Sequence, residues 1–296
     1  MRTDEQPVAT GSAPNIPATA VSTMRAIVQE SYGCADVLQM ARIPRPGIAD
    51  DEVLVRVHAA GLDRGTWHLM SGRPYLLRIL GFGFRRPKNR VPGIDVAGTV
   101  VAIGSVVTRF AVGNEVYGIA KGSFAEYAAA KQDKLAVKPT GLSWEQAAAA
   151  PESGSTAYQG VHDVGRLAPG HKLLVIGASG GVGSYAVQLG KAHGAEVTGV
   201  CSTAKVDLVA SLGADQVIDY TREDFADGSQ RYDLILDIGG NSSLSKLRRA
   251  LTPTGTVVIV GGEEGGRWTG GFGRSLRAAA LSPLLRQRLA MLVAKE

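Results

Sequence analysis

The sequence is poor in cysteine and aromatic residues and contains no long apolar run. Its two cysteines, Cys34 and Cys201, are too few for a disulfide framework or a four-cysteine zinc site, and this scarcity fits a reducing cytoplasm. No segment approaches the roughly 18 apolar residues that a membrane span requires, and no apolar signal-peptide core follows Arg2. We therefore expect a cytoplasmic protein with no membrane partner.

Positive charge is present without the usual features of a nucleic-acid-binding protein. The net charge is +5, but aromatic residues make up only 6% and no nucleic-acid-binding motif occurs. We therefore expect no nucleic acid, and an anionic cofactor is the simpler partner. The basic segment at residues 73–90 is interpreted as a solvated surface, in which the aliphatic parts of the Lys and Arg side chains pack on the protein. Attraction of an anionic acyl-carrier tail is the alternative.

Glycine is the residue in excess, with 38 among 296 residues. A hydrophobic content of 45% with 20% charged residues excludes bulk disorder, and the absence of a G-X-Y period excludes collagen. The surplus is expected where the backbone turns sharply or approaches a ligand.

The sequence pattern divides the chain into a tail and two domains. Residues 1–23 are interpreted as a disordered tail. Residues 24–142 alternate short strands with glycine turns, as in DDEVLVRVHAAG, which predicts a small β-barrel. Residues 143–296 begin with a capping box at Ser143 and Gln146 and then alternate near-continuous apolar strands with helices. This order predicts an α/β domain with a doubly wound parallel sheet, and RLAMLVAKE is expected to be its sixth strand.

A glycine-rich loop carries the strongest functional signal. The segment GASGGVG, residues 177–183, follows the apolar run KLLVI and opens a predicted helix. In that setting Gly180 lets the backbone approach a pyrophosphate, while Gly183 lets the helix pack closely on the sheet. The free N–H groups of the helix start attract the phosphates. We expect this loop to bind a dinucleotide through Ala178, Ser179, Gly180, Gly181 and Val182.

The end of the second predicted strand indicates which dinucleotide binds. NAD sites usually carry an acidic residue there, whereas this strand ends in Cys201, Ser202 and Thr203. Hydroxyl groups and Lys205 would accept a 2′-phosphate, and Tyr220 from the third strand could reach the same group. We therefore predict NADPH, with Cys201 beside the adenosine.

Several motifs together resemble the medium-chain dehydrogenase/reductase superfamily, and in particular its zinc-independent quinone oxidoreductase branch. They are HAAGLDRGTWHLMSG, PGIDVAGTVVAIG, VGNEVYG, GSFAEYAA, STAYQGV, GASGGVGSYAVQLGKAHGAEV and LGADQVIDY. The resemblance implies a GroES-like catalytic domain, a Rossmann domain and a homodimer formed through sheet edges. It places Thr156 near the nicotinamide and the loops 238–240 and 260–262, with Gly239 and Gly261, along the cofactor.

The same resemblance bears on metal and chemistry. Zinc alcohol dehydrogenases carry a cysteine and a Gly-His-Glu where this chain has Asp63 and Asp95, and an all-carboxylate set including Glu152 suits zinc poorly. We therefore expect no metal, and hydride transfer to a quinone or an α,β-unsaturated carbonyl. Tyr75 is the candidate proton donor, and the alternative is that its ring only packs on apolar neighbours. Asp63 stands at a position where relatives make a polar contact.

Other functions remain open at this point. An enoyl-thioester reductase is favoured if Arg85, Arg86 and Lys88 line the entrance of the pocket. A non-catalytic NADPH sensor or scaffold is favoured by Asp63. An NAD(P)-dependent alcohol dehydrogenase is a further alternative. Among the five histidines, His68 is the most favourably placed to face a pocket. Relatives continue beyond the sixth Rossmann strand, so the return to the catalytic domain is expected to be missing here.

Overall fold

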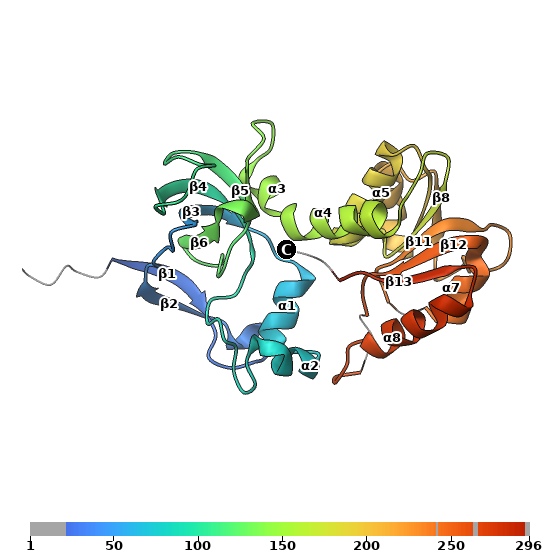
Figure 1. Ribbon diagram of the computed structural model, residues 1–296, viewed down its shortest axis with the longest axis horizontal. Helices are drawn as coiled ribbons and strands as arrows, with labels where there is room; N and C mark the ends of the chain where they lie inside the picture. Colours follow the sequence, from blue (N-terminus) through green and yellow to red (C-terminus); the bar gives the residue numbers. More distant parts are fainter. Residues whose placement is uncertain (1–21, 241, 263–265, 294–296) are drawn as a thin grey trace, which may run out of the picture.

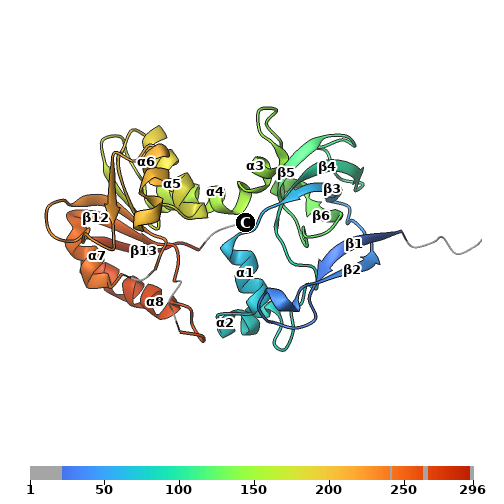
Figure 2. The same cartoon turned by 180° about the vertical axis from the view of Figure 1, so that it is seen from behind.

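A computed structural model describes residues 22–240, 242–262 and 266–293, which form two lobes (Figures 1 and 2). The predicted tail, residues 1–23, lies outside the described residues except for its last two positions, and the first strand already begins at Thr23. No helix within the described ranges combines the length and the apolar character needed to cross a membrane.

The N-terminal lobe contains a β-hairpin and a five-stranded antiparallel sheet. The hairpin pairs β1 (Thr23–Val28) with β2 (Gln39–Pro44). The sheet has the order β6 (Tyr127–Lys131), β3 (Glu52–Ala60), β4 (Asp95–Ile103), β5 (Glu115–Ile119) and β7 (Leu135–Val137). Side chains alternate along β3, since Val53 and Val55 are fully buried while Arg56 is exposed. Short helices complete the lobe: α1 (Arg64–Ser71), α2 (Tyr75–Leu77), η1 (Ala35–Val37), η2 (Arg78–Phe82) and η3 (Gln132–Lys134).

Two helices run between the lobes, α3 (Trp144–Ala148) and α4 (Pro151–Tyr158), and η4 (Gln159–Val164) follows (Figure 1). The capping box predicted at the start of α3 is confirmed: the Ser143 hydroxyl accepts from the Gln146 N–H, and the Gln146 side chain accepts from the Ser143 N–H. These two hydrogen bonds, within residues 143–146, satisfy two backbone N–H groups at the helix start without contacts from elsewhere in the chain.

The C-terminal lobe is a six-stranded parallel sheet. Its order is β10 (Gln216–Asp219), β9 (Glu196–Cys201), β8 (Lys172–Ile176), β11 (Tyr232–Asp237), β12 (Leu251–Ile259) and β13 (Arg288–Met291). The predicted sixth strand is confirmed as β13, at one edge. The direction of winding reverses between β8 and β11, which is where ligands bind in such sheets.

Helices cover both faces of this parallel sheet, as a near-continuous apolar strand requires. Leu173 and Val175 of β8 pack with α5 (Gly181–Ala192) and α6 (Val206–Ser211), whereas Leu174 packs on the other face. There α7 (Leu244–Ala250) contributes Leu247 and α8 (Phe272–Leu281) contributes Ala278. The short helices η5 (Thr203–Lys205) and η6 (Ser282–Leu284) complete the lobe. The doubly wound fold predicted from the sequence is confirmed.

Candidate active site

A cavity of about 300 Å³ lies between the lobes, beside the point where the sheet reverses. The N-terminal lobe contributes the start of α1 and two residues near α2, and α4 contributes one wall. The C-terminal lobe contributes the start of α5 and the loops after β11 and β12. The lining residues are Asp63, Arg64, Gly65, His68, Pro74, Leu77, Glu152, Ser153, Thr156, Val182, Ile238, Val260, Gly261, Gly262 and Gly270.

The predicted dinucleotide loop joins β8 to α5. The first N–H groups of an α-helix have no intrahelical partner. At α5 the N-cap residue is Gly180, which has no side chain to cap them. A Cβ on Gly180 would meet only the Gly177 carbonyl oxygen, at 3.4 Å, which leaves open space beside the loop. A Cβ on Gly183 would lie 2.1 Å from the same oxygen, so the helix packs against the loop as closely as glycine allows. This open, donor-rich helix start fits a pyrophosphate.

Two of the predicted cofactor residues lie beneath this surface. Ala178 is fully buried, and its N–H donates to the Val200 carbonyl. Cys201 is also buried, and burial raises the pKa of its thiol, followed by the negative charge of Asp219. Neither side chain reaches the loop surface, so both support the loop from the core. Ser179 and Gly181 remain at least partly exposed.

The residues predicted to hold a 2′-phosphate gather at the carboxyl ends of β9 and β10. Lys205 and Tyr220 are exposed, and the Tyr220 N–H donates to the Cys201 carbonyl, which brings Ser202 to the same edge. Asp219, to which no sequence motif assigned a role, lies at the same edge at the end of β10. Its carboxylate accepts hydrogen bonds from the Thr203 hydroxyl and from the Thr221 N–H and hydroxyl.

The loops expected to line the nicotinamide are joined by a buried ion pair. Asp237, fully buried at the end of β11, binds Arg274 of α8 at 2.5 Å. The same guanidinium donates to the carbonyl oxygens of Ser242 and Gly261. Burial raises the pKa of Asp237, and the Arg274 charge opposes this shift. The pair therefore fixes the loop that brings Gly261 to the cleft, and no local sequence signal identified Arg274.

The other predicted cofactor residues lie around that loop. Thr156, Val182 and Gly261 line the cleft. Gly239 lies beside it, and its N–H donates to the Ile176 carbonyl.

The two residues predicted to be catalytic have structural partners. The Asp63 carboxylate lines the cleft, but it also caps α1: one oxygen accepts from the Thr66 N–H and the other from the Thr66 hydroxyl, both at 2.7 Å. Tyr75 packs edge-on against Trp268, with ring centroids 5.4 Å apart, while its neighbour Pro74 lines the cleft. The Tyr75 ring thus packs against another aromatic side chain, as the alternative interpretation expects. Its role as a proton donor stays a prediction.

The Tyr75–Trp268 contact belongs to a bridge between the lobes. The Tyr75 N–H donates to the Arg267 carbonyl, and the Leu76 N–H donates to the Trp268 carbonyl. Gly270 approaches Pro74 so closely that an added Cβ would lie 2.6 Å from the proline ring. The segment at 266–270 therefore closes one side of the cleft.

His68 lines the cleft, and one of its ring nitrogens is hydrogen-bonded to the backbone. Its Nδ1 lies 2.7 Å from the Arg73 carbonyl oxygen, and a carbonyl can only accept, so Nδ1 carries a proton. The Nε2 position is left to exchange a proton with a molecule in the cleft. The sequence signal for His68 was only its place in HAAGLDRGTWHLMSG.

Asp95, at the start of β4, is the most perturbed acid near the cleft. Its pKa is raised to about 7, first because burial disfavours the carboxylate and then because Asp63 and Glu152 add negative charge. A hydrogen bond from the Glu152 N–H to Asp95 opposes this rise. Gly61 is required beside it, since a Cβ there would lie 2.9 Å from an Asp95 oxygen. Asp95 is therefore neutral over much of the acidic pH range.

The carboxylates near the cleft offer a poor set of ligands for zinc. Among the residues that the structure describes, no group of three histidine, cysteine, aspartate or glutamate side chains could hold a metal ion. Both oxygens of Asp63 are occupied by Thr66, and a protonated Asp95 is a poor ligand.

Comparison with known families places both lobes. Residues 49–140 match the family described as alcohol dehydrogenase GroES-like domain, and residues 181–276 match the family described as zinc-binding dehydrogenase. The latter name implies a metal for which the described residues offer no suitable set.

Several relatives are named as quinone or alkenal/one oxidoreductases. The chain is 37% identical to the tomato (Solanum lycopersicum) 2-methylene-furan-3-one reductase over 81% of its own length, but spans only 63% of that protein. It is 31% identical to the pig (Sus scrofa) quinone oxidoreductase, covering 82% of this chain and 75% of the relative. It is 33% identical to a chloroplastic quinone-oxidoreductase homolog of Spinacia oleracea, covering 81% and 75%.

Solved structures agree with this placement. The quinone oxidoreductase of Coxiella burnetii superposes with a TM-score of 0.79 at 28% identity, covering 93% of this chain and 84% of that one. The Escherichia coli quinone oxidoreductase complexed with NADPH gives a TM-score of 0.77 at 26% identity, covering 92% and 81%.

Proposed function

The chain belongs to the medium-chain dehydrogenase/reductase superfamily, among its quinone and alkenal oxidoreductases, and on this premise we propose that it is an NADPH-dependent, zinc-independent reductase of quinones or α,β-unsaturated carbonyls. The observation that carries the proposal is the cleft itself. It brings the glycine-rich face of a dinucleotide fold within reach of a histidine from the other lobe. The names of the relatives, which include an NADPH-dependent alkenal/one oxidoreductase, support the same reaction class.

The residues fit NADPH at three places. The uncapped start of α5 supplies N–H donors for the pyrophosphate, and the open space beside Gly180 gives them access. Lys205, Ser202 and Tyr220 supply charge and hydroxyls for a 2′-phosphate. Thr156 and Gly261 line the cleft where the nicotinamide belongs. When bound, the nicotinamide supplies a hydride, and the protein contributes position and exclusion of water.

For acceptors that need a proton from the protein, we assign it to His68 in place of Tyr75, because His68 lines the cleft whereas Tyr75 packs against Trp268. With Nδ1–H held by the Arg73 carbonyl, a protonated His68 presents Nε2–H to the cleft. An acceptor oxygen that gains negative charge during reduction would receive a hydrogen bond and then a proton from Nε2. No step in this scheme requires a metal to polarise the acceptor, since quinones and enones are already activated.

The proposal is tested by following NADPH oxidation with a panel of quinones, enones and crotonyl thioesters. We expect turnover of a quinone or an enone, and a His68→Gln variant that lowers kcat on the enone about a hundredfold. His162→Gln, at an exposed histidine outside the cleft, is the matched control and should leave kcat unchanged. NADPH binding without oxidation by any acceptor would refute the reductase and favour a sensor or scaffold. Stoichiometric zinc in the purified protein would refute the metal-free chemistry.

A further inference from the structure

One loop of the N-terminal lobe exposes a run of large apolar side chains. Ile79 and Leu80, in η2, are 65% and 61% exposed, and Phe84, just beyond η2, is 71% exposed. Single exposed apolar residues are ordinary on a protein surface, whereas several that adjoin one another mark a contact surface. We call residues 79–88 the η2 loop.

The base of the η2 loop is held by hydrogen bonds. The Lys88 N–H donates to the Phe82 carbonyl at 2.9 Å, which closes the loop. The Tyr32 hydroxyl lies 2.9 Å from the Phe82 carbonyl oxygen and 2.7 Å from that of Gly83, and it donates at this point. Gly83 has a φ of 112°, and an added Cβ there would lie 2.1 Å from the Arg86 carbonyl oxygen. The loop therefore has a defined shape, and its apolar side chains are presented by a fixed base.

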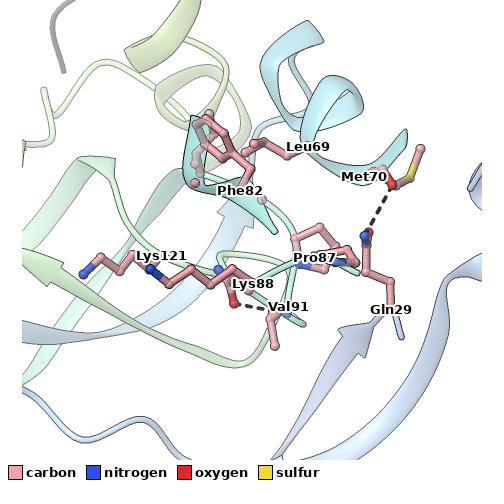
Figure 3. Close-up of a pocket in the computed structure, with 13 residues that line it drawn as sticks. Gln29, Leu69, Met70, Phe82, Pro87, Lys88, Val91 and Lys121 are labelled. Atoms are coloured by element: carbon pink, nitrogen blue, oxygen red, sulfur yellow. Dashed lines mark hydrogen bonds between the residues drawn. The ribbon is translucent and has the colours of Figure 1, made fainter. Parts of the chain in front are cut away.

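The exposed side chains do not fold back into the hollow beside the loop. This hollow, of about 540 Å³, lies between the loop and α1, and Figure 3 shows Phe82, Pro87 and Leu69 among the residues around it. Its lining residues are Gln29, Leu69, Met70, Gly81, Phe82, Pro87, Lys88, Asn89, Val91, Pro92, Gly93, Ile94 and Lys121. The three most exposed apolar side chains of the loop are not among them, so they lie on the outer surface.

Positive charge directly follows these apolar side chains. Arg85, Arg86 and Lys88 are exposed, and the sequence from 73 to 90 contains no aspartate or glutamate. Among the described residues, none of the three forms an ion pair, whereas Arg90 pairs with Glu30. Exposed apolar side chains beside unpaired cations are complementary to an anionic membrane surface.

The C-terminal lobe adds an exposed tryptophan nearby. Trp268 is 70% exposed, and its ring packs edge-on against Tyr75 of α2, the helix that leads into η2. Figures 1 and 2 both show α2 and the segment before α8 at the bottom of the molecule. Tryptophan is enriched where proteins meet the headgroup region of a bilayer. Both lobes thus contribute to one surface.

From this arrangement we propose that the η2 loop and Trp268 form a docking surface for an anionic lipid bilayer. The apolar side chains enter the interface, while Arg85 and Arg86 attract the lipid phosphates. Nucleic acid fits less well, because Ile79 and Leu80 are aliphatic and cannot stack on bases. Docking of this kind needs no helix that crosses the membrane. The surface is separate from the reductase reaction, since none of its residues lines the cleft.

Docking is measured by sedimentation of the full chain with lipid vesicles, without cofactor or acceptor, so the result does not depend on the reductase activity. We expect saturable binding to vesicles of phosphatidylcholine mixed with phosphatidylglycerol, and this binding should weaken as salt is raised. Binding to phosphatidylcholine alone should be at least about tenfold weaker. Absence of binding to the mixed vesicles, or equal binding to both kinds, would overturn the proposal.

A first pair of variants tests the apolar side chains. Ile79→Ser/Phe84→Ser should weaken binding to the mixed vesicles roughly tenfold, and both residues are exposed, so the fold should be kept. The matched control is Val106→Ser/Val112→Ser, at two exposed valines between β4 and β5, which should bind as the wild type does. An equal loss in both variants would contradict insertion of the η2 loop.

A second pair tests the charges. Arg85→Gln/Arg86→Gln should weaken binding roughly thirtyfold, because each cation near an anionic surface contributes separately. Arg249→Gln/Arg286→Gln removes the same net charge from exposed positions of the C-terminal lobe and should have little effect. If the two variants lose binding equally, the net charge of the chain is responsible and the proposed surface is wrong.

The competing occupant of the η2 loop is a second copy of the chain. Sedimentation velocity of the wild type and of Ile79→Ser/Phe84→Ser should give the same oligomeric state. A wild-type oligomer that dissociates in this variant, together with no vesicle binding by the wild type, would assign the loop to self-association and overturn the proposal.

Discussion

Replacing Asp95 by asparagine should change how the stability of the protein depends on pH. Asp95 has a folded-state pKa of about 7, against 3.8 for an ordinary carboxyl. Between these values the folded state keeps a proton that the unfolded state has lost, so the free energy of unfolding falls as pH rises. The interval between the two pKa values, at about 1.36 kcal/mol for each pH unit, corresponds to about 4 kcal/mol over the full range.

In the Asp95→Asn variant the amide would carry no titrating proton. It would still accept the Glu152 N–H, because its oxygen can take the place of Asp95 Oδ1. The variant should therefore gain stability relative to the wild type as pH rises. From about pH 4.5 to about pH 8 the gain should be about 3 kcal/mol, and it should level off above the folded-state pKa.

Urea unfolding of both proteins across this range measures the effect, and the difference between the two curves removes the contribution of the other carboxylates. Asp133→Asn, at an exposed residue of η3, is the matched control and should leave the pH profile of unfolding unchanged. A wild-type-to-variant difference that is constant with pH would show that Asp95 is ionised throughout, and would refute the reasoning from burial and from the charge of Asp63.

Three further predictions concern the nucleotide lobe. Gly183→Ala would place a Cβ 2.1 Å from the Gly177 carbonyl oxygen; it should lower the free energy of unfolding by about 1–3 kcal/mol and weaken NADPH binding, and wild-type stability in urea would contradict this. Arg274→Met would leave the Asp237 charge buried without its partner; we expect a loss of about 3–5 kcal/mol in the same assay, and a loss below about 1 kcal/mol would mean that the pair is dispensable. Lys205→Gln should raise the Kd for NADPH about tenfold and leave that for NADH unchanged; an equal effect on both cofactors in fluorescence titrations would remove Lys205 from the 2′-phosphate site.

The features that could be predicted from the sequence are those that local rules determine. The capping box at Ser143 needs only four consecutive residues. The burial of Leu173 on one face of β8 and Leu174 on the other follows from an apolar strand covered on both sides. The glycine loop is equally local, since Gly183 packs so closely on the Gly177 carbonyl, six residues earlier, that an added Cβ would lie 2.1 Å from its oxygen.

What the sequence did not reveal depends on contacts between distant segments. Trp268 meets Tyr75 across the cleft, and Gln29 shares a cavity with Lys121. Ala178 and Cys201 illustrate a different limit: they stand at positions that resemble cofactor contacts, but both side chains turn into the core. The motif gives the region of the chain to which the cofactor contacts are assigned, but it does not give the direction of each side chain.

Hydride transfer is measured most directly with NADPH that carries deuterium at the transferable position of its nicotinamide, with an enone as acceptor and mass spectrometry of the product. We expect a saturated ketone that carries one deuterium on the carbon β to the carbonyl, together with oxidised cofactor. Bound NADPH that remains reduced, with an enone that gains no deuterium and a quinone panel that is not reduced, would contradict it.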